Sequence, residues 1–176
     1  AGVPVILALG RLHENKGFDV LLEALSDLPD VFLWLAGEGP QKRLLTRMAN
    51  NLKVSDRVRF LGWRLDAPNL LATADALICP SRHEPLGNVI LEAWAQERPV
   101  IAAASDGPKE LIQNGKNGFL CEIDNASNLA DTIQKILSDS GLAKEIARDG
   151  AKTYKSNFSK NIVVGKYQDF FEKVVQ

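Results

Sequence analysis

The segment LGRLHENKGFDVLLEAL (residues 9–25) leads from the end of an apolar run, through a polar hinge, into a helical pattern. Two cations, Arg11 and Lys16, stand in the hinge, each next to a glycine. A strand followed by a short loop and a helix is the repeating unit of α/β folds, and these folds bind ligands at the carboxyl ends of their strands. The segment therefore predicts both a fold class and the position of a site for an anion.

The alternation of apolar run and helical pattern continues along most of the chain. The runs are short, rich in aliphatic residues and apolar on both faces, which is typical of parallel strands covered by helices on both sides. The expected strands are Val3–Leu9, Val31–Ala36, Val58–Leu61, Ala76–Cys79, Val100–Ala103 and Gly118–Cys121. We expect a doubly wound, Rossmann-like parallel sheet of about six strands with helices on both faces. Two consecutive helical patterns, near residues 142–154 and 162–175, predict a helical C-terminal tail.

Composition limits the partners that the protein can have. The 176 residues fit one domain, and the net charge of −1 gives no overall attraction for nucleic acid or an anionic membrane. No apolar run reaches the roughly 20 residues that span a bilayer, so we expect no transmembrane segment. Cys79 and Cys121 each end an apolar run, and we expect buried free thiols and a cytosolic compartment. Because Ala1 stands directly before a strand, we expect a fragment cut at a domain boundary.

The two hinge cations suit a polyanion. Arg11 offers a planar fork for two phosphate oxygens, Lys16 offers a point charge, and the helix that follows Gly17 adds free N–H groups and a partial positive charge. Together they predict a diphosphate site, and the alternative is a pair of solvated loop charges. The chain has no G-x-x-x-x-G-K-[ST] and no G-x-G-x-x-G after the first strand, which argues against a P-loop and an NAD site.

The segment PSRHEPLGNVILEA (residues 80–93) follows the fourth expected strand and carries two carboxylates. Glu84 lies in the loop, Glu92 lies inside the helix, and Gly87 and Asn88 mark the helix start. A carboxylate can accept hydrogen bonds from two neighbouring hydroxyls, so the pair suits hydroxyls on both sides of a diphosphate, as in a nucleotide sugar. A glycosidase-type acid and nucleophile is an alternative, although it leaves the cations unexplained. Glu92 alone could also be a helix surface charge.

These motifs resemble a known family. GRLHENKG and EPLGNVILEA, with AGEGP, DRVRFLGW and ADALICPSR, resemble the C-terminal domain of the retaining glycosyltransferases of family four, which have the two-domain GT-B architecture. The resemblance implies that residues 1–176 are the nucleotide-sugar (donor) binding domain of a hexosyltransferase, and that the N-terminal acceptor domain is absent from this chain. The fragment alone is then expected to be inactive. Leu86 stands where phenylalanine is common in the family, which leaves the donor open.

The resemblance also implies a role for each site residue. Arg11 and Lys16 would hold and neutralise the diphosphate, Glu84 would hydrogen-bond the transferred sugar, and Glu92 would bind the ribose. We expect core positions for Trp34, Trp63 and Trp94. Contact with the base is an alternative for Trp63 alone, because it follows the third expected strand. The remaining donor-binding residues are Gly10, Gly17, Gly62, Arg82, Leu86, Gly87, Asn88 and Val89.

Cofactors and partners follow from the same resemblance. The chain has no Asp-x-Asp motif, so we expect neither a metal nor another cofactor, with cations in the metal's place. The expected partners are a nucleotide-diphosphate sugar and, through the missing domain, an acceptor saccharide or lipid-linked glycan of lipopolysaccharide or another surface polymer. The expected location is the cytoplasm, peripheral at the inner face of the membrane.

Two other classes stay open. A non-catalytic module of the flavodoxin or receiver type would also have a doubly wound sheet, but a receiver needs an acidic cluster at the strand ends, where this chain has Arg, Lys and Glu. Another GT-B enzyme, such as a sugar-nucleotide epimerase or a phosphorylase, would share the donor site.

Overall fold

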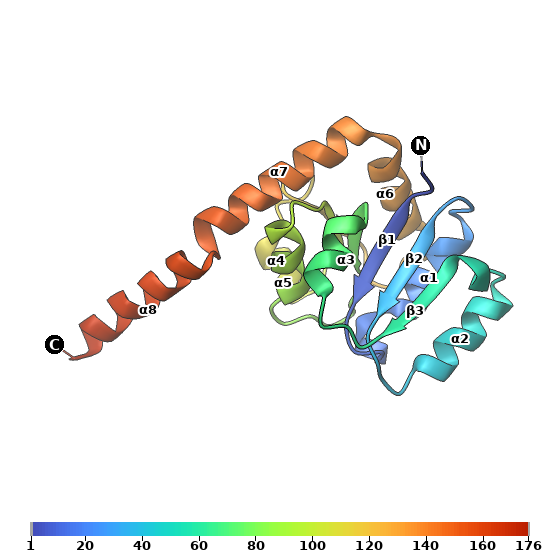
Figure 1. Ribbon diagram of the computed structural model, residues 1–176, viewed down its shortest axis with the longest axis horizontal. Coiled ribbons are helices and arrows are strands. Elements are labelled where there is room, and N and C mark those ends of the chain that lie inside the picture. Colours follow the sequence, from blue (N-terminus) through green and yellow to red (C-terminus); the bar gives the residue numbers. More distant parts are fainter. Residues whose placement is uncertain (1, 176) are drawn as a thin grey trace.

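Six parallel strands form one sheet in the computed structural model, which describes residues 2–175 (Figure 1). The spatial order is β3-β2-β1-β4-β5-β6, the order of Rossmann-like dinucleotide-binding folds. The strands are β1 (Val5–Leu9), β2 (Phe32–Ala36), β3 (Val58–Gly62), β4 (Ala76–Cys79), β5 (Val100–Ala103) and β6 (Phe119–Cys121). The predicted fold class is confirmed, and every expected strand is present within two residues of its predicted bounds.

Helices follow the strands as the periodicity predicted. They are α1 (Phe18–Ser26), α2 (Lys42–Asn51), α3 (Ala67–Thr73), α4 (Asn88–Ala95), α5 (Asp106–Leu111), α6 (Ala126–Ser138), α7 (Ser140–Asn157) and α8 (Lys160–Val175). Two short 3-10 turns, η1 (Glu14–Lys16) and η2 (Ser55–Arg57), precede α1 and β3. The predicted helical tail is therefore α7 and α8.

Neighbouring residues of each strand enter two different cores. In β1, Ile6 and Ala8 pack with α1, α2 and α6 on one face of the sheet, while Leu7 packs with α3 and α4 on the other. This is the period of two that a strand imposes on its side chains. Cys79 and Cys121 are both buried free thiols, as predicted.

The crevice of the sheet opens between β1 and β4. These strands pair in parallel, with Ile6 opposite Ala76 and Leu7 opposite Leu77. The chain leaves β1 toward β2 and leaves β4 toward β5, on opposite sides. The loops after the two strands therefore diverge, and doubly wound sheets bind ligands at this point. Both sequence segments singled out above lie here.

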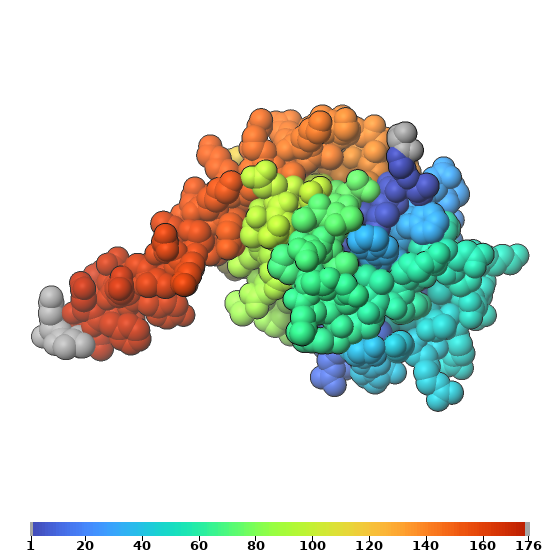
Figure 2. All heavy atoms as spheres, viewed as in Figure 1, coloured from blue at the N-terminus to red at the C-terminus, as the bar shows by residue number. Residues whose placement is uncertain are grey.

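The last helix projects from the body. Figures 1 and 2 show α8 as an arm that continues beyond α7. Its Tyr167, Phe170 and Phe171 are exposed, and among the described side chains α8 adds none to the buried core. Within residues 2–175, no helix is both long and apolar enough to cross a bilayer.

Gly150 lets α7 pack closely on α4. A Cβ at this position would lie 2.4 Å from Trp94 Cδ1, and the buried indole is held by a 2.9 Å hydrogen bond from its Nε1 to the carbonyl of Asn117. Because the ring has no room to move, we expect Gly150→Ala to lower the free energy of unfolding by about 1–3 kcal/mol in urea. The control is Gly165→Ala in α8, where no atom lies within 4 Å of a Cβ. A helical alanine there should raise stability by about 0.5–1 kcal/mol, and equal changes at both sites would contradict the packing argument.

Candidate functional site

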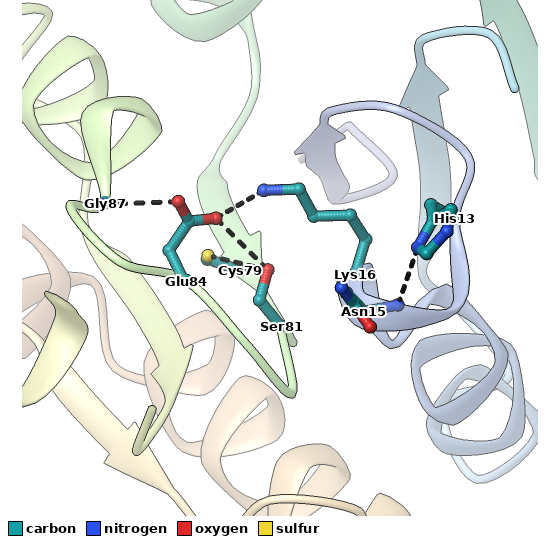
Figure 3. Close-up of polar contacts among 7 residues, drawn as sticks. All are labelled: His13, Asn15, Lys16, Cys79, Ser81, Glu84 and Gly87. Atoms are coloured by element: carbon teal, nitrogen blue, oxygen red, sulfur yellow. Dashed lines mark hydrogen bonds and ion pairs between the residues drawn. The ribbon is translucent and has the colours of Figure 1, made fainter. Parts of the chain in front are cut away.

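Lys16 and Glu84 meet across the crevice between β1 and β4. Lys16 Nζ lies 2.5 Å from Glu84 Oε2, and Figure 3 shows the two side chains pointing toward each other from opposite loops. The residues are 68 positions apart in the sequence, and the strand order brings them together. The site thus contains a cation and a carboxylate at the carboxyl edge of the sheet.

Further polar groups hold the Glu84 carboxylate in place. The residue is only 8% exposed. Its Oε2 accepts a hydrogen bond from the Ser81 hydroxyl at 3.4 Å, and its Oε1 accepts one from the backbone N–H of Gly87, also at 3.4 Å (Figure 3). Because its two oxygens contact three different groups, the side chain has one preferred orientation. The sequence reasoning missed Ser81, although its place three residues before Glu84 in a buried turn could have indicated this contact.

The loop that carries Lys16 is a tight turn. His13 caps η1, with its Nδ1 accepting from the N–H of Asn15 at 3.3 Å. Gly17 then has a left-handed backbone (φ 62°), and a Cβ there would lie 2.1 Å from the carbonyl oxygen of Pro80. Only glycine allows the turn to approach the β4 loop this closely. Lys16 is thereby directed at Glu84.

Arg11 lies earlier in the same loop and is free to bind a ligand. It is exposed, and within the part of the chain that the structure describes its side chain makes no hydrogen bond or ion pair. The first N–H groups of α1, which follows Gly17, add a partial positive charge to this edge. An exposed guanidinium without a protein partner can donate hydrogen bonds to phosphate oxygens at little cost.

A hollow of about 270 Å³ adjoins the pair. Its lining is Leu9, Gly10, Ala36, Gly37, Trp63, Arg64, Ala67 and Glu92. Gly10 links it to the cation, because a Cβ on Gly10 would lie 3.5 Å from Lys16 Cε. The hollow is thus lined by apolar and aromatic residues together with the charged Arg64 and Glu92, and it lies next to the Lys16–Glu84 pair.

The tryptophans divide between core and pocket. Trp94 is fully buried and Trp34 packs against the same core, as predicted. Trp63 is 73% exposed, so the core position expected for it is wrong. The reason is its place just after β3, where the chain has left the sheet and reached the carboxyl edge.

Glu92 sits on the second turn of α4 at the edge of the hollow. Its side chain is exposed, yet neighbouring atoms remove part of the water around the carboxylate, and this desolvation raises the pKa of Glu92 above its ordinary value of 4.5. The charged form of Glu92 is therefore less favourable in the folded, ligand-free protein than in water. Hydrogen bonds donated by hydroxyl groups would stabilise such a partly desolvated carboxylate.

We expect Glu92→Gln to raise the melting temperature at pH 7. A raised pKa in the folded state means that the glutamate stabilises the fold below its unfolded pKa and loses that contribution as the pH rises through the folded pKa. The gain should therefore shrink as the pH falls toward 4, in melting curves recorded across that range. Glu172→Gln on exposed α8 is the control. A lower melting temperature for Glu92→Gln at pH 7 would contradict the desolvation.

The other predicted site residues lie on the same edge of the sheet. Gly87 is buried and is the N-cap of α4. Leu86 and Asn88 on either side of it are exposed, and Val89 is partly buried. Gly62 ends β3, near the Glu38 carboxylate. Arg82 is the exception in orientation: its guanidinium is bound by Asp19 and Asp124. The donor contacts assigned to all these residues stay predictions.

Strand order and diverging loops define this chain as a Rossmann-like domain, with the Lys16–Glu84 pair at the carboxyl edge of its sheet. The sequence model of the family described as "Glycosyl transferases group 1" matches residues 1–153. The chain therefore belongs to the group 1 glycosyltransferases.

Relatives of known sequence and structure agree with this assignment. The chain is 42% identical over 167 residues to the lipopolysaccharide core biosynthesis glycosyltransferase LpsE of Rhizobium meliloti, covering 95% of the chain and 49% of that protein. It matches a glycosyltransferase structure from Rickettsia africae with TM-score 0.93 and 32% identity, covering 100% of this chain and 49% of the other. It matches Anabaena HepE in complex with UDP and glucose with TM-score 0.90 and 31% identity, covering 98% and 48%. The chain spans about half the length of these relatives, in line with one of the two domains of a GT-B enzyme.

Proposed function

We propose that this chain is the donor-binding, C-terminal domain of a retaining, metal-independent hexosyltransferase of GT-B architecture. The observation that carries the proposal is the Lys16–Glu84 pair at the switch point of the sheet, beside the hollow between Trp63 and Glu92. This arrangement offers one group for each part of a nucleotide sugar: an aromatic pocket for the base, carboxylates for hydroxyls and cations for the diphosphate.

The size of the pocket and one structural relative support a particular donor. A hollow of about 270 Å³ has room for a single base, and exposed Trp63 offers a face for stacking. HepE, a structural relative, was crystallised with UDP and glucose. We therefore propose a UDP-hexose as donor, with the base beside Trp63 and the ribose diol on Glu92.

The proposed reaction breaks the bond between the anomeric carbon and the diphosphate oxygen. The electron pair stays on the diphosphate, so negative charge grows there while the sugar becomes electron-poor. Lys16 and Arg11 stabilise that growing charge more than the charge of the bound donor, which lowers the barrier. An acceptor hydroxyl then bonds to the anomeric carbon, and its proton passes to the departing diphosphate oxygen. Glu84 holds the sugar hydroxyls during the transfer.

The acceptor is assigned to the part of the enzyme outside this chain. The relative LpsE is named for lipopolysaccharide core biosynthesis, so we propose a lipopolysaccharide or other surface-glycan precursor, bound by an N-terminal domain. The full enzyme would then work in the cytoplasm, at the inner face of the membrane. This domain alone would bind donor without transferring it.

Calorimetry of the intact protein with UDP-, GDP- and ADP-hexoses tests the proposal. We expect UDP-hexose to bind at least tenfold more tightly than the other two and to bind equally well with EDTA present. The Trp63→Ala variant should weaken UDP binding by about 5- to 100-fold, the range for loss of one stacked base. The exposed Leu65, two residues further along the loop, provides the control, Leu65→Ala. Absence of binding to all three donors would overturn the proposal in favour of a non-catalytic module.

A further inference from the structure

Arg82 connects three segments of the chain through one guanidinium group. Its Nη1 donates to the carbonyl of Glu14 at 2.7 Å and to Asp19 Oδ1 at 2.8 Å, and its Nη2 donates to Asp19 Oδ2 at 2.6 Å. Its Nε lies 2.6 Å from Asp124 Oδ1. All three guanidinium nitrogens are therefore engaged by protein oxygens, which leaves little donor capacity for a substrate.

The contact with Asp19 has the geometry of a strong pair. It is bidentate, which fixes the orientation of both groups, and each side chain is less than a third exposed. Burial alone would raise the pKa of Asp19, but the hydrogen bonds and charge of Arg82 outweigh it and lower the pKa. Asp19 therefore stays ionised throughout the neutral range. Asp124 adds a second, more exposed carboxylate from the loop after β6.

The loop after β4, which carries Arg82, contacts η1 at successive residues. Glu14 accepts from Arg82, and the carbonyl of Asn15 accepts from the N–H of His83 at 3.2 Å. Gly17 lies against the Pro80 carbonyl, as described above. Lys16 is the residue between these docked positions, and its side chain is the one that extends to Glu84 (Figure 3).

We propose that Arg82 is a positioning residue that clamps the η1 turn onto the β4 loop, so that Lys16 is held opposite Glu84. On this proposal Arg82 acts on the donor through Lys16, and not by the direct contact expected from the sequence. Arg82 fixes the backbone at Glu14 and helix α1 at Asp19, so that Lys16 is held in place without a ligand. The effect on transfer rests on the proposed function, whereas the clamp itself does not.

Amide hydrogen exchange of the intact protein without nucleotide tests the clamp directly. The N–H groups of Lys16 and Gly17 donate within the turn, to His13 and Glu14 carbonyls. In Arg82→Ala we expect these two amides to exchange about 10- to 100-fold faster, the effect of losing charge-assisted hydrogen bonds. Amides of β1 and β4 should keep their protection. Arg148→Ala on α7 is the matched control, because this exposed arginine has only a 3.5 Å contact to Asp149.

Two further variants keep the test decisive if Arg82→Ala fails to fold. Asp19→Asn removes the charge of one partner, and Arg82→Lys keeps the cation but has one nitrogen with three N–H donors in place of a guanidinium that contacts four oxygens. Both variants should therefore give intermediate exchange in the turn. Unchanged exchange at residues 16 and 17 in the folded variants would overturn the proposal, whether or not the protein is a glycosyltransferase.

Kinetics of the full-length enzyme separate positioning from direct contact. If Arg82 acts through Lys16, Arg82→Ala should lower kcat about 10- to 100-fold with little change in the KM of the donor. In the Lys16→Ala background, Arg82→Ala should lower kcat by less than about threefold, because the effects of residues that act as a unit are not additive. Additive losses would mean that Arg82 binds the donor itself. A wild-type enzyme that transfers no sugar would instead count against the proposed function, and the exchange result would stand.

Discussion

Replacing Lys16 by alanine is expected to lower the turnover of the full-length enzyme by about 10²- to 10³-fold. On the proposed mechanism Lys16 stabilises charge that grows on the diphosphate as the glycosidic bond breaks, and removal of one such donor costs about 3–4 kcal/mol of transition-state stabilisation. The site makes the effect large because Lys16 Nζ is already in place, 2.5 Å from Glu84 Oε2, before any donor binds. The turnover of Arg11→Ala should fall by the same order, since the Arg11 side chain has no protein partner in the described structure and is available for the phosphates.

Initial rates at saturating UDP-hexose and a fixed acceptor measure this effect. Lys155→Ala is the matched control, because Lys155 also pairs with a glutamate, Glu97 at 3.1 Å, but does so on exposed surface of α7. Its turnover should match the wild type. Near wild-type rates for both Lys16→Ala and Arg11→Ala would refute the roles of these cations, and a loss confined to KM would mean that they bind the donor without stabilising the transition state.

The fold was predictable because its signals are local. Each strand is a short apolar run and each helix a run of period 3.6, so the alternation in segments such as residues 9–25 is enough to predict a doubly wound sheet. The same reasoning located the site, since loops after parallel strands lie on one edge. Glu84 and Lys16 were thus assigned to one crevice, and the structure brings them into contact.

Side-chain partners could not be predicted in this way. Arg82 lies in the predicted loop, but its partners Asp19 and Asp124 are distant in the sequence, with Asp19 63 positions away, and no local pattern signals such contacts. Trp63 was misplaced for a related reason. Its large apolar ring favours burial, and only the position of the strand end decides that the ring lies outside the core.

The Lys16–Glu84 pair should also separate stability from activity. Lys16→Met removes the counter-charge of a carboxylate that is only 8% exposed, and the remaining hydrogen bonds from Ser81 and Gly87 are long, at 3.4 Å each. Removing one partner of a fully buried ion pair costs about 3–5 kcal/mol. The Lys16 side chain is 24% exposed and Glu84 keeps two other hydrogen bonds, so we expect the free energy of unfolding in urea to fall by a smaller amount, about 1–3 kcal/mol. The ion pair itself adds little net stability over a neutral pair, because both groups lost water when they were buried.

The double variant Lys16→Met/Glu84→Gln should therefore recover most of the lost stability, because a neutral side-chain amide at this position needs no counter-charge and can still accept from Gly87. Its transfer activity should stay as low as that of Lys16→Met, since the cation is absent from both. Urea unfolding and initial rates on the wild type and these two variants measure the two properties side by side. A double variant as unstable as Lys16→Met would show that the lysine contributes through packing and not through charge. Regained transfer in the double variant would show that Lys16 only neutralises Glu84, and that another cation, with Arg11 the nearest candidate in the loop, carries the leaving diphosphate.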